Sequence, residues 1–319
     1  MDEALLGSLF ASTLRVSTPL LICALAGMFS ERSGVVDVGL EGKMLFAAFA
    51  AGAVGALQGS TSLALFAAML TAISLSWLHG LACVSHQGDQ VVSGVAINII
   101  AAGLTAVLGI AMFSQGGQTP PVTAEVRIQP LFEGIGVSAV THQAGVLNGL
   151  INHNFIVYLA FALVPACWWL MFKTRFGLRL RAVGENPQMV DAAGVSVIRL
   201  RYAALTINGA LCGLAGSYLV LAQSASFSPN MTAGRGFMAL AALIFGRWHP
   251  VGAMGACLLF GFMDAAAIRL QGVSVPGIGE VPVQMIQALP YVLTVVLLAG
   301  LIGKAVAPQA LGRPYSKER

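Results

Sequence analysis

Long apolar runs, separated by short polar stretches, recur along most of this 319-residue chain. About 20 consecutive apolar residues are enough for a helix to cross the hydrocarbon core of a bilayer. The pattern therefore predicts an all-α polytopic membrane protein, with residues 1–319 forming a single transmembrane domain of about nine helices, within a range of eight to ten. The expected spans are residues 4–29, 43–58, 61–83, 91–113, 154–172, 203–222, 235–247, 251–270 and 284–303.

Two stretches, residues 31–55 and 226–246, are atypical in the same way, because glycine, proline and charged residues directly precede a short apolar helix. Each is interpreted as a broken helix. Irregular backbone at membrane depth needs protein or water to satisfy it, so both breaks are expected to face an internal cavity. Corresponding broken segments in two halves of a chain are typical of a transport pathway. The alternative is that both are ordinary loops between short spans.

Polar residues inside the membrane are costly and mark either a pathway or a helix contact. For Asn98, a pathway role and a hydrogen bond between helices are both open. Gly209 and Gly213 form a G-x-x-x-G pattern, which predicts a close helix contact and carries no chemistry. The residues expected beside the pathway are Asp37, Glu41, Asn98, Asn230 and Arg235.

The composition supports a membrane protein, since 57% of the residues are hydrophobic and 9% are charged, whereas about 25% are charged in soluble proteins. Six of the 17 Lys and Arg residues lie between residues 173 and 201. Short loops rich in these residues stay in the cytosol, so the 173–202 loop is expected to be cytosolic and the 114–153 loop extracytoplasmic, with an external N-terminus. The outer loop either contacts an external partner or closes the outer face. The sequence contains no basic face of the kind that binds nucleic acid.

The cytosolic loop contains one short helical element. Asn186 and Pro187 predict its start, because proline is well tolerated in the first turn, and Gly194 predicts its end. A helix of this length is not stable alone in water and needs a surface to rest on. That surface belongs either to a partner or to the chain's own cytosolic face.

Motifs for catalysis are absent from the sequence, so no catalytic residue is expected. The pairs Gly42-Lys43 and Gly303-Lys304 lack the flanking residues of a phosphate-binding loop. The five cysteines are scattered singly, and the five histidines are dispersed and interpreted as loop or interfacial residues, so no metal site is expected. Any energy source must therefore be a partner protein or an ion gradient.

Three segments in order carry a resemblance to a known family: ERSGVVDVGLEGKM near the N-terminus, VGENPQMVDAAGVSV in the cytosolic loop, and GRGFMALAALIFGRWHPVGA further on. With them the chain resembles the permease subunits of bacterial ABC importers of the simple-sugar and nucleoside class, the branch with the ribose and branched-chain amino-acid permeases. Within this branch it is most similar to the shorter of two permeases in nucleoside importers. The resemblance covers nearly the whole chain.

The resemblance implies a multi-pass protein of the bacterial inner membrane in which two permease subunits enclose a path for a small solute, and it favours a pair of paralogues over two copies of this chain. It also implies ATP-binding cassette subunits that bind ATP and Mg, and an extracytoplasmic substrate-binding lipoprotein. No cofactor is expected on this chain. The implied coupling helix is 186–195, and the residues expected to couple to the ATPase are Gly184, Glu185, Asn186, Pro187, Asp191, Ala192, Ala193 and Gly194.

One position departs from the family pattern, because related permeases commonly carry Asn where this chain has Asp37. The change adds a possible charge beside the pathway, and replacing Asp37 by Asn is expected to preserve assembly and alter uptake. The sequence thus predicts a permease subunit that imports a nucleoside with ATP hydrolysed elsewhere. The alternatives are the same machine with a monosaccharide or other small polar solute, and an ion-gradient-driven secondary transporter that uses Asp37, Glu41 or Asp264 as its coupling carboxylate.

Overall fold

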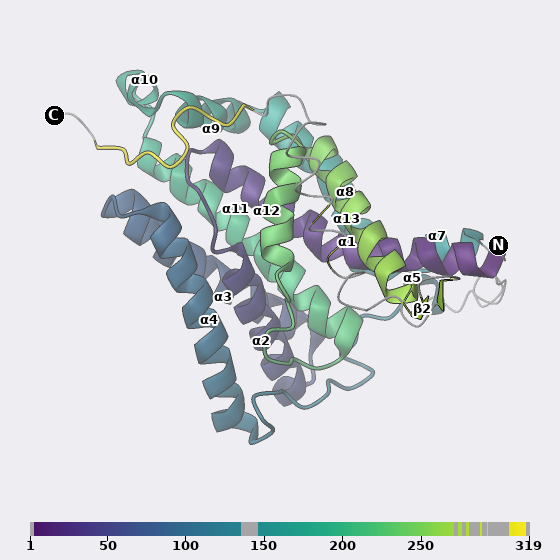
Figure 1. The fold of residues 1–319 in the computed structure, drawn as a ribbon. Helices are drawn as coiled ribbons and strands as arrows, with labels where there is room; N and C mark the ends of the chain where they lie inside the picture. Colours follow the sequence, from purple (N-terminus) through teal and green to yellow (C-terminus); the bar gives the residue numbers. More distant parts are fainter. Residues whose placement is uncertain are drawn as a thin grey trace.

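The structure is a computed structural model that describes residues 3–134, 146–270, 274–275, 279–280, 288, 292 and 306–316. Within these residues it is a bundle of helices (Figure 1). Seven described helices are long and apolar enough to cross a membrane. They are α1 (Glu3–Arg32), α2 (Leu40–Gln58), α3 (Thr61–Gly80), α4 (Gln90–Phe113), α8 (Phe155–Lys173), α11 (Val197–Tyr218) and α13 (Pro250–Leu270). Helices α3 and α11 continue into the π-helical turns η1 (Leu81–Ser85) and η2 (Leu219–Ser224).

These seven helices correspond to seven of the nine predicted spans. The eighth, residues 235–247, is the shorter helix α12 (Arg235–Phe245) of 11 residues, which rises only about 16 Å. The ninth, residues 284–303, lies outside the described residues except at positions 288 and 292. Two short strands, β1 (Ser274–Val275) and β2 (Gly279–Glu280), pair antiparallel. Among the described residues these strands depart from the predicted all-α fold.

Helix α11 begins six residues earlier than predicted, at Val197, although this adds Arg199 and Arg201 to an apolar helix. The Ser196 side chain caps the helix by accepting a hydrogen bond from the backbone N–H of Arg199. Arg201 is completely buried, and its Nε donates to the carbonyl oxygen of Ser33 over 3.2 Å. A cap and a backbone acceptor therefore extend the helix past the point where hydrophobicity alone would end it.

Helices α1, α2 and α11 form the centre of the bundle, while α3, α4, α8 and α13 surround them with one apolar face outward. The contact between α3 and α11 is very close, because a Cβ on Gly209 would lie 2.6 Å from the Cα of Ile73 and one on Gly213 would lie 2.4 Å from that of Met69. The predicted glycine-mediated helix contact is thus confirmed.

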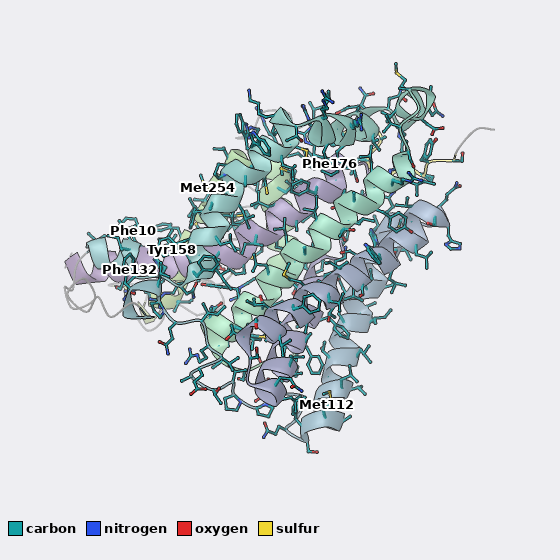
Figure 2. The ribbon with its side chains drawn as sticks, turned by 180° about the vertical axis from the view of Figure 1, so that it is seen from behind. Phe10, Met112, Phe132, Tyr158, Phe176 and Met254 are labelled. Carbon is teal, nitrogen blue, oxygen red and sulfur yellow. The ribbon has the colours of Figure 1, made fainter. Side chains whose placement is uncertain are left out.

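The two long polar loops contain short helices. The 173–202 loop forms α9 (Arg175–Glu185) and α10 (Pro187–Ala192), and the described parts of the 114–153 loop form α5 (Leu131–Gly134) and α7 (Val146–Ile151). Phe176 at the start of α9 and Met112 near the end of α4 lie at opposite ends of the bundle (Figure 2). Residues 306–316 return to the end of the bundle that carries α9 and α10 (Figure 1).

Candidate functional site

The non-helical segment 33–39 between α1 and α2 runs into the interior of the bundle. The N–H of Val36 donates to Oε1 of Gln90, the first residue of α4, over 2.6 Å. The N–H of Gly42 donates to Oδ1 of Asn98, eight residues further along the same helix, over 2.7 Å. Eight residues of an α-helix correspond to about 12 Å. Helix α2 therefore starts about two turns inside the bundle.

Side chains from neighbouring helices satisfy the backbone of segment 33–39. His79 Nε2 lies 3.0 Å from the carbonyl oxygen of Val36, and Asn98 Nδ2 donates to the carbonyl oxygen of Val38 over 3.0 Å. Irregular backbone at this depth requires such partners. Protein side chains supply these bonds, and the expectation that the break faces an internal cavity stays a prediction. The interpretation of His79 as a loop or interfacial residue was wrong, because it is completely buried in α3.

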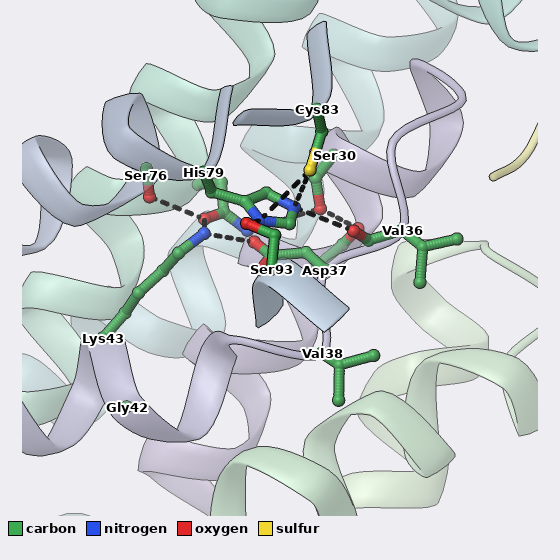
Figure 3. A network of polar contacts seen from close by, with 12 residues as sticks. Ser30, Val36, Asp37, Val38, Gly42, Lys43, Ser76, His79, Cys83 and Ser93 are labelled. Atoms are coloured by element: carbon green, nitrogen blue, oxygen red, sulfur yellow. Dashed lines mark hydrogen bonds and ion pairs between the residues drawn. The ribbon is translucent and has the colours of Figure 1, made fainter. Parts of the chain in front are cut away.

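Asp37 sits in segment 33–39 at the centre of a buried polar network (Figure 3). Its Oδ2 lies 2.5 Å from Nζ of Lys43, and both side chains are completely buried. Lys43 also donates to Oδ1 of Asn208 over 3.1 Å. Ser76 donates to the same oxygen, and Asn208 Nδ2 donates to Ser30 Oγ. The charge that Asp37 adds to the interior is thus balanced by Lys43, as a buried charge requires.

Glu41, in the first turn of α2, accepts hydrogen bonds from the second glycine-rich segment, residues 226–246. Its Oε1 accepts from the N–H of Gly234 over 2.9 Å, and its Oε2 accepts from the N–H of Gly236 over 2.6 Å. These groups belong to the start of α12, where free N–H groups and the helix dipole favour a negative charge. A Cβ on Gly236 would lie 2.5 Å from the Cα of Glu41. The two glycine-rich segments therefore meet at this carboxylate.

The remaining residues expected at a pathway lie on the second glycine-rich segment. Arg235 Nη1 donates to the carbonyl oxygen of Met231 over 3.0 Å. Asn230 is exposed and has a positive φ of 57°. Of the five expected residues, Glu41 accepts from the backbone on both sides of Arg235. Asp37 lies in segment 33–39, and Asn98 bonds the backbone of that segment. The polar side chains of Lys43, Ser76, His79 and Gln90 were missed as parts of the site, and their signal was a polar residue within an apolar helix or at its start.

The short helix α10 projects from the end of the bundle. Asn186 caps it by accepting from the N–H of Met189 over 3.1 Å, Pro187 occupies the first turn, and Gly194 ends the turn that follows with a φ of 79°. Val190 is the buried residue of the helix, whereas Met189 is 70% exposed.

The other residues near α10 divide into two groups. Glu185, Ala192 and Ala193 are exposed, and Asp191 is half-buried. Gly184 is buried, and a Cβ there would lie 2.2 Å from the carbonyl oxygen of Arg32. Gly184 therefore allows the end of α9 to pack against the end of α1. The exposed residues around α10 form a surface that is open to solvent.

A family model described as the permease component of the branched-chain amino acid transport system matches residues 9–300. The chain belongs to this permease family. The guanosine ABC transporter permease protein NupQ of Bacillus subtilis is 38% identical over 98% of each chain. The nucleoside ABC transporter permease protein NupC of Lactococcus lactis is 39% identical over 97% of this permease and 96% of the relative.

More distant relatives add two observations. TsgC13 of Haloferax volcanii, named for glucose transport, is 31% identical over 97% of this permease and 98% of the relative. A second Bacillus subtilis protein named as a guanosine permease, NupP, is 27% identical over 81% of this permease and 73% of the relative. An inward-facing structure assigned to the metal-chelate type of ABC transporter has a TM-score of 0.52 at 14% identity, covering 92% of this permease and 85% of that chain. This structure supports the fold alone.

Proposed function

We propose that this permease is a membrane subunit of an ATP-driven bacterial importer of nucleosides. The observation that carries the proposal is the similarity to NupQ and NupC, because it extends over nearly the whole of all three chains at 38–39% identity. The buried network around Asp37 and the carboxylate of Glu41 fit a permease, since they hold two irregular segments inside a membrane domain.

The α10 segment is proposed to be the cytosolic coupling helix that an ATP-binding subunit grips. Its exposed Met189 and the open space around Gly194 leave a surface onto which a partner fits. The buried Val190 fixes the helix to the bundle. A push on α10 reaches the end of α1 through Gly184, which packs so close to the carbonyl oxygen of Arg32 that no Cβ would fit between them. This route leads from the ATPase to segment 33–39.

The other subunits follow from the same proposal. A second permease completes the path, and a paralogue is favoured because Bacillus subtilis contains both NupQ and NupP, which are both similar to this chain. An extracytoplasmic lipoprotein delivers the solute, ATP and Mg bind to the ATPase subunit, and this chain carries no cofactor. The complex lies in the inner membrane, with the α9–α10 end of the bundle in the cytosol.

Uptake in cells tests the substrate. A strain that lacks this permease is expected to lose uptake of labelled uridine at low external concentration, and the gene is expected to restore it. Excess unlabelled nucleoside should compete, whereas ribose should not. Competition by ribose and glucose but not by nucleosides would instead support the sugar importer, the second candidate that the TsgC13 similarity favours.

The energy source is tested separately. Both oxygens of Glu41 and one oxygen of Asp37 are engaged in bonds that hold the fold, so these carboxylates are poor candidates for the coupling group of a secondary transporter. Deleting the partner ATPase while the proton gradient stays intact is expected to abolish uptake. Uptake that survives this deletion, and that a protonophore stops, would contradict an ATP-driven importer.

A further inference from the structure

The C-terminal segment 306–316 binds the end of α9 through its backbone. The N–H of Ala310 donates to the carbonyl oxygen of Gly184 over 2.8 Å. The N–H of Gln309 donates to Oε2 of Glu185 over 3.3 Å. Both acceptors directly precede α10. The segment is thus fastened to the base of the proposed coupling helix (Figure 1).

The same segment also binds the non-helical segment 33–39. The N–H of Gly312 donates to the carbonyl oxygen of Gly34 over 3.2 Å. Gly34 has a φ of 85°, and a Cβ there would lie 3.1 Å from the carbonyl oxygen of Ala310. A further bond runs from Nε2 of Gln87, in the turn before α4, to the carbonyl oxygen of Tyr315 over 3.3 Å.

Tyr315 adds an apolar anchor to these backbone bonds. It is 8% exposed and packs in a small cluster with Val183 of α9, Val190 of α10 and Val197 of α11. Val190 is the buried residue of α10, so Tyr315 belongs to the cluster that holds this helix on the bundle. A helix of six residues needs such a tertiary contact to remain ordered.

Free volume lies beside the C-terminal segment. A cavity of about 310 Å³ is lined by Val36, by the turn and first residues of α4 at 87–91, and by Gly312 and Pro314. Gly34 is therefore bonded to the C-terminal segment, while Val36, two residues further on, borders the cavity. A displacement of the C-terminal segment has room to move segment 33–39 with it.

We infer that residues 309–315 form a strap that ties the proposed coupling helix α10 to segment 33–39, with Tyr315 as a positioning residue for energy coupling. The inference rests on the proposed function, because α10 must receive the motion of an ATPase. The strap acts in parallel with the Gly184 contact. The Tyr315 ring connects the strap to α10, and Gly312 connects the strap to segment 33–39, in which Asp37 lies.

The test uses the complete transporter, with both permeases and the ATPase, in proteoliposomes supplied with receptor and labelled uridine. The measured quantity is the coupling ratio, the number of uridine molecules transported per ATP hydrolysed. Tyr315→Ala is expected to lower this ratio about fivefold or more, the lower end of typical coupling between sites, while ATP hydrolysis continues. Tyr315→Phe keeps the ring and is expected to stay within about twofold of wild type, as is the exposed neighbour control Ser316→Ala.

A second variant removes Tyr315 in a different way, so that the test does not depend on the assembly of Tyr315→Ala alone. A chain that ends after Arg313 removes Tyr315 but retains the bonds from Gln309, Ala310 and Gly312, and it is expected to match Tyr315→Ala. An unchanged coupling ratio in both variants, a Tyr315→Phe variant as uncoupled as Tyr315→Ala, or failure of both variants to assemble would each overturn the strap. A wild-type complex that hydrolyses ATP without moving uridine would instead contradict the proposed function.

Discussion

Nζ of Lys43 lies 2.5 Å from the carboxylate of Asp37, and neither side chain is exposed. The two residues are six positions apart, with the start of α2 between them. The ion pair therefore closes a short loop that joins the end of segment 33–39 to the first turn of α2. It is held in turn by Asn208 of α11, so it ties three elements of the bundle together.

The pair predicts a specific pattern of stability. Removing one charge leaves the other buried without compensation, which costs about 3–5 kcal/mol, whereas replacing both often costs little. Asp37→Asn and Lys43→Met are each expected to lower the thermal stability of the purified permease strongly, and the double variant is expected to recover most of it. The ion pair thus changes the expectation from sequence that Asp37→Asn alone preserves assembly. Losses that simply add in the double variant would contradict the coupling.

The contact between Glu41 and the start of α12 predicts a strict requirement for glycine at position 236. Gly236→Ala places a Cβ 2.5 Å from backbone atoms of Glu41, so α12 must move away and the two hydrogen bonds to the carboxylate are lost. The expected result is a large fall in the amount of folded permease, measured by fluorescence-detected size-exclusion chromatography. Gly255→Ala on α13, where a Cβ meets nothing within 4 Å, is the matched control and should behave like wild type.

The surface around α10 predicts a loss of coupling without a loss of folding. Ala193 is exposed and directly follows the helix, so Ala193→Trp does not disturb the bundle but fills the space proposed for the ATPase. Uridine uptake and substrate-stimulated ATP hydrolysis are both expected to fall at least about tenfold, a loss of about 1.4 kcal/mol or more in coupling, at normal abundance. Ala193→Ser serves as the conservative control. Full uptake by the Trp variant would remove α10 from the ATPase contact.

The sequence was sufficient for features that depend on local patterns. Apolar runs predicted seven described helices, and the spacing of Gly209 and Gly213 predicted the close contact with α3. The Asn186-Pro187 pair predicted the start of α10, and the helix ends at Ala192, two residues before the predicted stop at Gly194. Each of these signals acts over a few residues, so hydropathy, spacing and turn chemistry determine it.

Features that depend on partners distant in the chain could not be predicted in the same way. Glu41 and Asn98 were expected beside a pathway because they are polar, and this stays a prediction. That their polar atoms bond backbone groups of other segments could not be foreseen. Polarity alone does not distinguish a residue that faces a solute from one that satisfies an irregular backbone. The strap at residues 309–315 was missed for a related reason, because its contacts lie more than 100 residues away in sequence.

The shared carboxylate of Glu41 has a mechanical consequence. Because its two oxygens bind the start of α12 while Glu41 itself lies in the first turn of α2, separating these two helix starts would leave a half-buried carboxylate and two backbone amides without their partners. They are therefore expected to travel as one rigid body. Opening of the bundle during the transport cycle would then occur by sliding of this rigid body along the neighbouring helices.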